Sequence, residues 1–367
     1  MIMSISWDFR SMQTRVAGDS GKLDVVDIQK PLVLMLTDFR GLIPQRIMAW
    51  DGYDLARIGK ILTDSGADVA ILGVHEFDFS LLRGRKHVAA IYASSQEPRY
   101  KQYLQDVVSN LHFYGVRLYP SLEHLMAHED KAYQAVKLAS TSISAPRSYV
   151  YGNREQAFEF LGNAEYPLVG KSPDGSGSKG VLLIKNERDG RAFIDRHMVH
   201  RALQKGRPLF VRAFQRIFKP RPVLGLVVFQ DFIPNLEGDW KILMWGDKAC
   251  GLYRENRPKD FRASGSGKVH FVDIPSHILD FAMDVLEKLD LPWGSLDIGF
   301  TGEKCLLFEY QGLHFGLTAA DRSSFYFRKV NGKWERVEGK IPIETEMANI
   351  ILRDMSRLGW LTERKDC

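Results

Sequence analysis

Residues 166–186, YPLVGKSPDGSGSKGVLLIKN, constrain the fold more than any other stretch, because two short apolar runs flank a loop of small residues. Gly175, Gly177 and Gly180 satisfy the pattern GxGxxG, but its dinucleotide-binding form requires a helix directly after the glycines. Here the run 181–184, Val-Leu-Leu-Ile, follows, and branched apolar residues favour a strand. The stretch therefore predicts a β-hairpin with a glycine-rich tip, not the start of a βα unit.

The same hairpin carries a lysine at each shoulder, Lys171 and Lys179. It is not a Walker A loop, because Gly180 follows Lys179 where that motif needs Ser or Thr. Glycines let backbone N–H groups approach an anion closely, and lysines supply positive charge. Two interpretations stay open at this point: a flap over phosphates, and a mobile surface hairpin made of ordinary turn residues.

Length and composition narrow the class of protein. A chain of 367 residues predicts two or three domains, and 45% apolar with 26% charged residues is typical of a globular protein. The net charge of +5 is spread over scattered basic residues, which allows anionic ligands but predicts no nucleic-acid surface. Three widely spaced cysteines form no disulfide or zinc framework. With no signal-peptide or membrane-spanning run, we expect a cytoplasmic protein without a membrane partner; a homodimer is compatible with the sequence.

We expect residues 1–28 to be an extension and residues 29–120 to form an open, mostly parallel α/β domain, because apolar strands alternate there with helical patterns. The expected strands are 31–36, 68–73, 87–93 and 116–119, and the expected helices are 51–65 and 100–114.

After residue 120 the pattern predicts an α+β domain over 121–367. One helix is expected over 121–140, and His124 and His128 lie one turn apart on it beside Glu129. No third metal ligand is evident, so this pattern predicts a solvent-exposed helix face and not a zinc site. The remaining expected strands are 147–151, 209–213, 223–233, 240–244, 248–254, 295–300 and 305–310, and the remaining helices are 155–161, 190–203, 275–289 and 343–358.

Two carboxylates, Asp297 and Glu309, lie inside apolar strands of this second domain. Burying such groups is costly unless they are paired or bind a metal. A three-residue loop over 302–304 would place them opposite each other, with Gln311 on the same face. Like charges in that arrangement repel, and a divalent cation with oxygen ligands, Mg²⁺ or Mn²⁺, would reverse the sign. A two-residue turn would put the two acids on opposite faces, and outward-facing surface carboxylates are the alternative.

The order of these motifs resembles the ATP-grasp superfamily, and most closely its carboxylate–amine ligases of the glutathione-synthetase and peptide-tagging type. The resemblance covers about residues 130–316, and more loosely the α/β region before them, which would be the pre-ATP-grasp domain. It implies an ATP-grasp fold, in which two α+β subdomains clamp ATP. Residues 147–233 would form the small nucleotide subdomain with its flap, and residues 234–367 the metal and substrate subdomain.

The resemblance also implies roles for single residues. Lys131 and Lys171 would contact the ATP phosphates, and the hinge beside adenine would lie at the end of the strand 223–233. Asp239 resembles the first residue of the family's Asp-x-Arg, with Lys241 in place of the arginine. The flap would comprise Gly175, Ser176, Gly177, Ser178, Lys179 and Gly180, and the hinge Gln230, Asp231, Phe232 and Ile233.

The metal ligands implied by the resemblance are Asp297, Glu309 and Gln311, where Gln311 replaces the asparagine of the family's Glu-x-Asn. Arg254 and Arg262 would handle the phosphoryl group or the acyl substrate.

The implied reaction joins a carboxylate to an amine, either small molecules or peptides, through an acyl phosphate, with ATP and Mg²⁺ (or Mn²⁺) as cofactors. Lys171, Arg262 and Arg254 would be its catalytic side chains. The alternatives are phosphotransfer to an alcohol and a regulatory ATP-binding protein with weak turnover.

Overall fold

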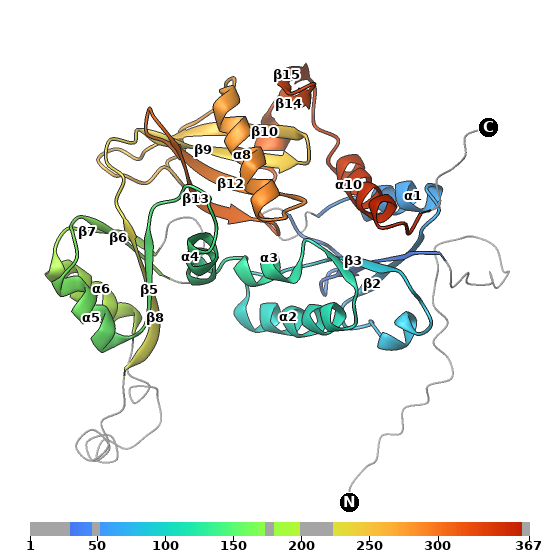
Figure 1. Cartoon of the computed structure of the whole chain (residues 1–367), viewed down its shortest axis with the longest axis horizontal. Helices are drawn as coiled ribbons and strands as arrows, with labels where there is room; N and C mark the ends of the chain where they lie inside the picture. Colours follow the sequence, from blue (N-terminus) through green and yellow to red (C-terminus); the bar gives the residue numbers. More distant parts are fainter. Residues whose placement is uncertain (1–29, 46–51, 173–179, 199–222, 362–367) are drawn as a thin grey trace, which may run out of the picture.

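The computed structural model describes residues 30–45, 52–172, 180–198 and 223–361. Within these residues the strands form three sheets. In Figure 1 the small sheet (β5–β8) lies at the left, the first sheet (β1–β4) at the right, and the largest sheet above and between them. The first sheet belongs to the N-terminal part of the chain, and the other two follow it in sequence. None of the described helices combines the length and the apolar character that a bilayer crossing requires.

The first sheet is parallel and has the strand order β2-β1-β3-β4. Every residue of its central strand is buried, as expected for a parallel strand that is covered on both faces. The open α/β arrangement predicted for this region is confirmed. Its elements are β1 (Leu32–Thr37), α1 (Leu55–Asp64), β2 (Asp68–Gly73), η1 (Phe79–Leu82), β3 (Val88–Tyr92), α2 (Pro98–Phe113) and β4 (Arg117–Tyr119).

The second sheet is small and antiparallel, with the order β5-β8-β6-β7. Its strands β6 and β7 pair from Leu168↔Ile184 to Lys171↔Val181, so the predicted hairpin is confirmed. The hairpin tip, residues 173–179, lies outside the described residues, as do the predicted strand 209–213 and the end of the helix predicted over 190–203. The elements are β5 (Ser148–Asn153), α5 (Arg154–Gly162), β6 (Leu168–Lys171), β7 (Val181–Ile184), α6 (Glu187–His197) and β8 (Leu224–Asp231).

The third and largest sheet has the order β13-β12-β9-β10-β14-β15, with β11 paired to β10. Helix α8 buries Ile278, Leu279, Ala282, Val285 and Leu286 against it. The hairpin of β14 and β15 was not predicted. The elements are β9 (Gly238–Trp245), β10 (Lys248–Glu255), β11 (Val269–His270), α8 (Ser276–Lys288), β12 (Trp293–Phe300), β13 (Cys305–Gln311), α9 (Thr318–Arg322), β14 (Phe325–Val330), β15 (Lys333–Glu338) and α10 (Ile343–Arg357).

The single helix predicted over 121–140 is wrong. The chain forms two helices, α3 (Leu122–Ala127) and α4 (Lys131–Ala139), because the Asp130 carboxylate accepts the Tyr133 N–H at 2.8 Å and starts a new helix. The solvent-exposed histidine face is also wrong. His124 and His128 are both buried: the first packs edge-on against Tyr310, and the second hydrogen-bonds to the hydroxyl of Ser94 at 2.7 Å.

Helix α10 connects the first sheet to the largest one. It packs beside α1 (Figure 1), and its residue Asp354 accepts hydrogen bonds from Arg117 Nε at 2.8 Å and from the Tyr119 hydroxyl at 2.6 Å, both on β4. Burial alone would raise the pKa of Asp354. The hydrogen bonds from Tyr119 and Arg357 and the charge of Arg117 outweigh burial, so the pKa lies below its usual value. The last helix of the chain therefore helps to fix the first sheet in place.

We expect Asp354→Ala to lower the free energy of unfolding by about 1–3 kcal/mol, because two partly buried donors lose a charged acceptor. Urea denaturation followed by circular dichroism measures this change. The control is Asp284→Ala, which removes only the exposed pair with Lys288 and should cost about 0.5 kcal/mol or less. Equal denaturation midpoints for the two variants would contradict the proposed link.

Candidate active site

One cavity of about 470 Å³ is bordered by segments from all three parts of the molecule. The first sheet contributes Gln96, which follows β3, and the small sheet contributes Val169 and Lys171. The largest sheet forms the floor, and the loop 256–268 forms a further wall. A cavity of this size that lies where separate sheets meet is typical of a ligand-binding site.

Strand alternation explains why the floor is polar. On β9, β10 and β12 the side chains that face the cavity alternate along the strand, and β13 departs from this pattern only at a bulge. Residues between the cavity-facing ones, such as Ile242, Leu296 and Leu307, pack in the core with α8. The register aligns Lys241, Asp297 and Glu309 in one row across β9, β12 and β13. The floor residues are Asp239, Lys241, Leu252, Arg254, Ser295, Asp297, Phe308, Glu309 and Gln311.

Asp297 and Glu309 do face each other, but not through the predicted turn. The strands pair Phe300 with Cys305, which leaves a loop of residues 301–304, and this register alone would put Phe308 opposite Asp297. A β-bulge between Asp297 and Ile298 shifts the pairing by one residue. As a result, Phe308 and Glu309 both line the cavity although they are consecutive.

Arg254 organises the acidic groups of the floor. Its Nε and Nη2 donate to the two carboxylate oxygens of Asp239 at 2.6 and 2.8 Å, and its Nη2 lies 2.8 Å from Asp297 Oδ2. Burial would raise the pKa of Asp297, but the charges of Arg254 and Lys241 outweigh it and lower this pKa. Burial, with the nearby charge of Asp297, raises the pKa of Asp239 to about 6.

The predicted metal ligands offer oxygen atoms that fit a hard cation. Asp297 Oδ1 is buried, accepts no hydrogen bond, and lies 3.7 Å from the Lys241 ammonium. Gln311 Nε2 donates to Glu309 Oε1 at 2.9 Å, whereas Gln311 Oε1 faces the Glu129 N–H at 3.4 Å. Over the described ranges, no three His, Cys, Asp or Glu side chains converge as a metal cluster. A cation here would therefore complete its shell with water or phosphate oxygens, as Mg²⁺ commonly does.

The two lysines predicted to contact phosphates line the same cavity. Lys131 is the first residue of α4, and Lys171 is the last residue of β6. Burial and the charge of Lys131 lower the pKa of Lys171 to about 8, although Glu309 and Asp297 act in the opposite direction. The structure thus brings these lysines and the paired carboxylates of β12 and β13 to one site.

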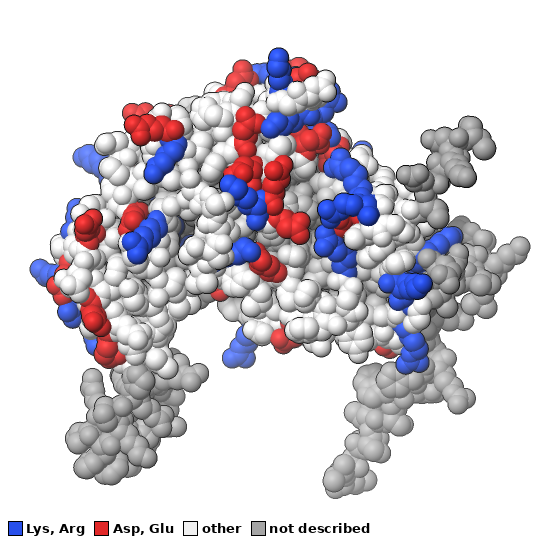
Figure 2. Space-filling model, viewed as in Figure 1, with Lys and Arg blue, Asp and Glu red and all other residues white. Residues whose placement is uncertain are grey.

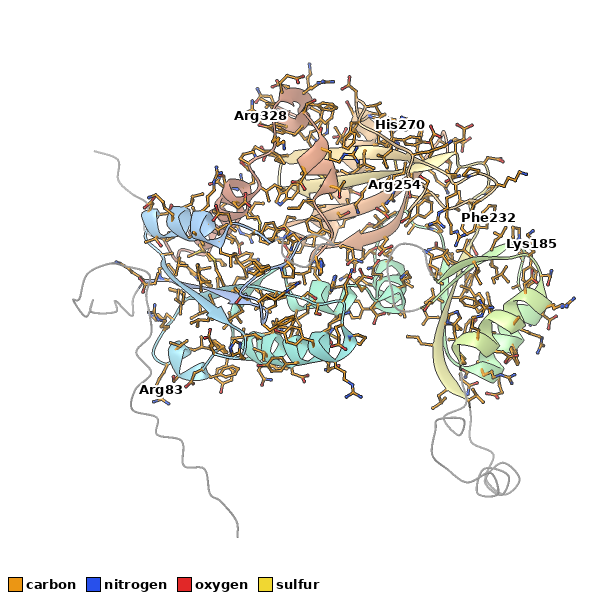
Figure 3. The ribbon with its side chains drawn as sticks, turned by 180° about the vertical axis from the view of Figure 1, so that it is seen from behind. Arg83, Lys185, Phe232, Arg254, His270 and Arg328 are labelled. Atoms are coloured by element: carbon orange, nitrogen blue, oxygen red, sulfur yellow. The ribbon has the colours of Figure 1, made fainter. Side chains whose placement is uncertain are left out.

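The hinge residues Gln230, Asp231, Phe232 and Ile233 also line the cavity. The Gln230 side chain is buried and donates to the Ser148 hydroxyl at 3.0 Å, so it also ties β8 to β5. Phe232 meets Phe261 edge-on, with their ring centroids 5.8 Å apart. Figure 3 shows Phe232 between Arg254, on the largest sheet, and Lys185, which directly follows β7 of the small sheet.

Arg262 lies on the loop 256–268 and contacts both this loop and strand β7. Its guanidinium donates to the Asp260 carboxylate at 2.6–3.0 Å and to the Val181 carbonyl, on β7, at 3.0 Å. Of the predicted flap residues only Gly180 is described; Gly175, Ser176, Gly177, Ser178 and Lys179 lie outside the described residues. Gly180 accepts the Ser172 N–H at 2.8 Å, and any Cβ at this position would collide with the Ser172 side chain.

The cavity residues that sequence reasoning missed include Gln96, Glu129, Phe308 and His314. Glu129 was considered only beside the histidines, and its position at a helix break was hidden by the prediction of one continuous helix. Phe308 reads as an ordinary core residue of an apolar strand, and only the bulge turns it to the cavity.

Charge on the surface follows the scattered distribution seen in the sequence. On the face shown in Figure 2, Asp and Glu side chains lie beside Lys and Arg side chains through the middle of the molecule, without a broad area of one sign. This face therefore shows no broad charged area that would attract ligands of one sign.

Neither a protein-family model nor a curated protein sequence matches the chain. Among solved structures, the D-cycloserine synthetase DcsG superposes with a TM-score of 0.53 at 12% identity, over 88% of this chain and 99% of that one. A RimK domain protein ATP-grasp from Sphaerobacter thermophilus DSM 20745 gives 0.47 at 14% identity, over 78% and 92% of the two chains. D-alanine–D-alanine ligase from Bacillus anthracis gives 0.48 at 11%, over 90% and 98%. The chain has the ATP-grasp fold, and the predicted fold class is confirmed.

We expect Arg254→Met to destabilise the protein by about 3–5 kcal/mol at neutral pH, because Asp239 and Asp297 would stay buried without their main counter-charge. The loss should shrink as the pH falls towards 5. Without Arg254 the pKa values of the two buried carboxylates rise, so in the folded variant they take up protons before they do in the unfolded chain. Urea denaturation at several pH values measures both effects. Arg254→Lys, which keeps the charge but loses the two-pronged contact, should cost less; an equal cost for both variants would contradict this account.

Proposed function

We propose that this protein is an ATP-dependent ligase that joins a carboxylate to an amine and releases ADP and phosphate. The observation that carries the proposal is that a single cavity holds two lysines, a row of carboxylates and a hinge segment at once. An ATP molecule needs cations for its phosphates, a hard metal ion and an apolar slot for its base, and each of these requirements has a matching group. The ATP-grasp fold supports the same reaction class.

The base of ATP would lie against the hinge, beside Phe232 and Phe261. Lys131 and Lys171 would neutralise the β- and γ-phosphates. Asp297 and Glu309, with Gln311 after rotation of its amide, would hold Mg²⁺. The bound cation would supply charge neutralisation at the transferring phosphoryl group.

In the first step the substrate carboxylate oxygen bonds to the γ-phosphorus while the bond to the bridging oxygen of ADP breaks, which gives an acyl phosphate. In the second step the amine nitrogen attacks the acyl carbon, phosphate leaves with the bonding electrons, and an amide remains after loss of a proton. Arg262 would stabilise the oxyanion of the second step. Arg254 keeps Asp239 and Asp297 ionised and in position. Both steps are helped by the exclusion of water, because an acyl phosphate hydrolyses readily.

A second candidate is a regulatory ATP-binding protein with weak turnover. One contact favours it: the Gln311 oxygen faces the Glu129 N–H and not the paired carboxylates. Phosphotransfer to an alcohol is a third outcome of the same site, and it requires no amine. A cytoplasmic location, a homodimer, and the domain boundaries at residues 29–120 and 121–367 remain predictions.

We expect ADP and phosphate to form only when an acid and an amine are both supplied, which a screen of carboxylate–amine pairs with mass-spectrometric detection of the amide can measure. Glu309→Ala should lower turnover about 100-fold or more, because several kcal/mol of transition-state charge stabilisation are lost with the cation. Glu303→Ala, in the exposed turn 301–304, is the control and should keep full activity. AMP and pyrophosphate as products, or full activity of the Glu309 variant, would refute the proposal.

We also expect the affinity of the protein for AMPPNP, an ATP analogue, measured in the presence of Mg²⁺, to fall as the pH rises from 7 to 9. Free Lys171, with a pKa of about 8, loses its proton in this range, and phosphate binding favours the protonated amine. Above that pKa the dissociation constant should rise by up to about tenfold per pH unit. Isothermal titration calorimetry of the wild type and Lys171→Arg, which stays protonated, measures the difference. Lys185→Arg, at the exposed end of the hairpin, should keep the wild-type slope; a flat wild-type profile would contradict the assignment.

A further inference from the structure

One area of the cavity is left without a role by the assignments above. Its walls are Gln96, after β3, Glu129, between α3 and α4, and His314, after β13. Gln311 joins this area to the paired carboxylates. Because the adenine and phosphate contacts are assigned to other walls, this polar area is available for a second reactant.

The backbone at Glu129 is held in an unusual conformation. Its φ of 55° is left-handed, a conformation that is unfavourable for a residue with a side chain. The neighbouring His128 ring is buried and bound to the Ser94 hydroxyl. The Gln134 amide, also buried, donates to two backbone carbonyls, one before the break and one on β13, at 2.9 and 3.0 Å. The break between α3 and α4 is therefore fixed from both sides, and it directs Glu129 into the cavity.

The Glu129 carboxylate lies near charged groups of both signs. Gln96 Nε2 donates to its Oε1 at 3.1 Å, and its backbone N–H faces Gln311 Oε1. Burial and the nearby charge of Glu309 raise the pKa of Glu129, while the Gln96 hydrogen bond, Lys131 and Lys101 lower it. Because Glu309 is assigned to the metal ion, Glu129 is the carboxylate of this area that remains to attract a cation.

The ligand chemistry of this area fits an organic cation. A metal ion needs several hard ligands, and Glu129 is the one carboxylate among the three residues that wall this area. A primary ammonium group instead carries three donors, which a carboxylate and neighbouring amide oxygens can accept. The reaction proposed above also requires an amine next to the site where the acyl phosphate forms.

We propose that Glu129, supported by Gln96, binds the ammonium group of the amine substrate. The inference rests on the proposed ligase function and deepens it: the amine substrate is a primary ammonium, recognised by the first sheet and the helix break. Glu129 is here a binding residue for the substrate, and Gln96 a positioning residue for Glu129.

Saturation-transfer difference NMR with the full-length protein tests this in the presence of Mg²⁺ and AMPPNP. The probes are glycinamide, alaninamide, phenylalaninamide and lysinamide, which carry an ammonium but no carboxylate, and the matching N-acetyl amino acids, which carry a carboxylate but no α-ammonium. At least one amide should bind the wild type. Its dissociation constant should rise about 10- to 100-fold in Glu129→Gln, as expected when a charged hydrogen-bond acceptor is neutralised.

Two further variants separate binding from folding. Gln96→Ala should weaken amide binding less, because it removes only the support of Glu129. Glu123→Gln is the control on the same stretch of chain: its carboxylate pairs with Lys137 at 2.7 Å outside the cavity, and amide binding should not change. All variants should keep the wild-type affinity for Mg²⁺ with AMPPNP, which also reports that they fold.

Unchanged amide binding in Glu129→Gln, or no amide binding to the wild type, would overturn the inference. Equal weakening of the N-acetyl amino acids and the amides in that variant would also overturn it, since a loss of charge recognition must act on the ammonium alone. The ligase proposal fails separately, if Mg²⁺ with AMPPNP does not bind or if no acid–amine pair yields ADP.

Discussion

The site depends on burying carboxylates beside enough positive charge. Asp239 and Asp297 are both largely removed from water, and each would be costly there without a partner. Arg254 satisfies both, because a guanidinium can donate to two carboxylates at once. The other oxygen of Asp297, Oδ1, is buried and accepts no hydrogen bond. Asp297 lies between Lys241 and Glu309 in the row across the sheet. The ion pair therefore leaves one carboxylate oxygen of the floor for the cation proposed above.

Separate parts of the chain meet at this floor, and each supplies a different kind of group. The small sheet brings Lys171 at the end of a strand, and the break before α4 brings Glu129 and Lys131 two residues apart. A carboxylate and an ammonium so close in sequence can face different reactants, since one residue has a left-handed backbone and the other begins a helix. Under the two proposals above, phosphates and an organic cation would therefore bind in separate areas of the cavity.

The sequence predicted the elements whose pattern is local. The strand 68–73 has the predicted bounds, and the hairpin around residues 173–179 follows from two apolar runs on either side of small residues. The helix break was missed because apolar periodicity continues through residues 121–140, whereas the break depends on the Asp130 cap and on buried contacts of His128 with Ser94, more than thirty residues away. Long-range burial of this kind leaves no periodic signal.

The pairing of Asp297 with Glu309 shows the same limit more sharply. The two residues were predicted to face each other through a three-residue turn, and they do face each other, but through a longer loop and a compensating bulge. One more residue in the turn shifts the strand register by one, and a bulge shifts it back by one. A three-residue turn without a bulge and a four-residue loop with a bulge therefore both pair Asp297 with Glu309. Facing carboxylates were therefore predictable from their positions in apolar strands, whereas the orientation of Phe308, which depends on where the extra residue lies, was not. That residue narrows the cavity beside Glu309, so an unpredictable backbone detail contributes to the shape that a substrate meets.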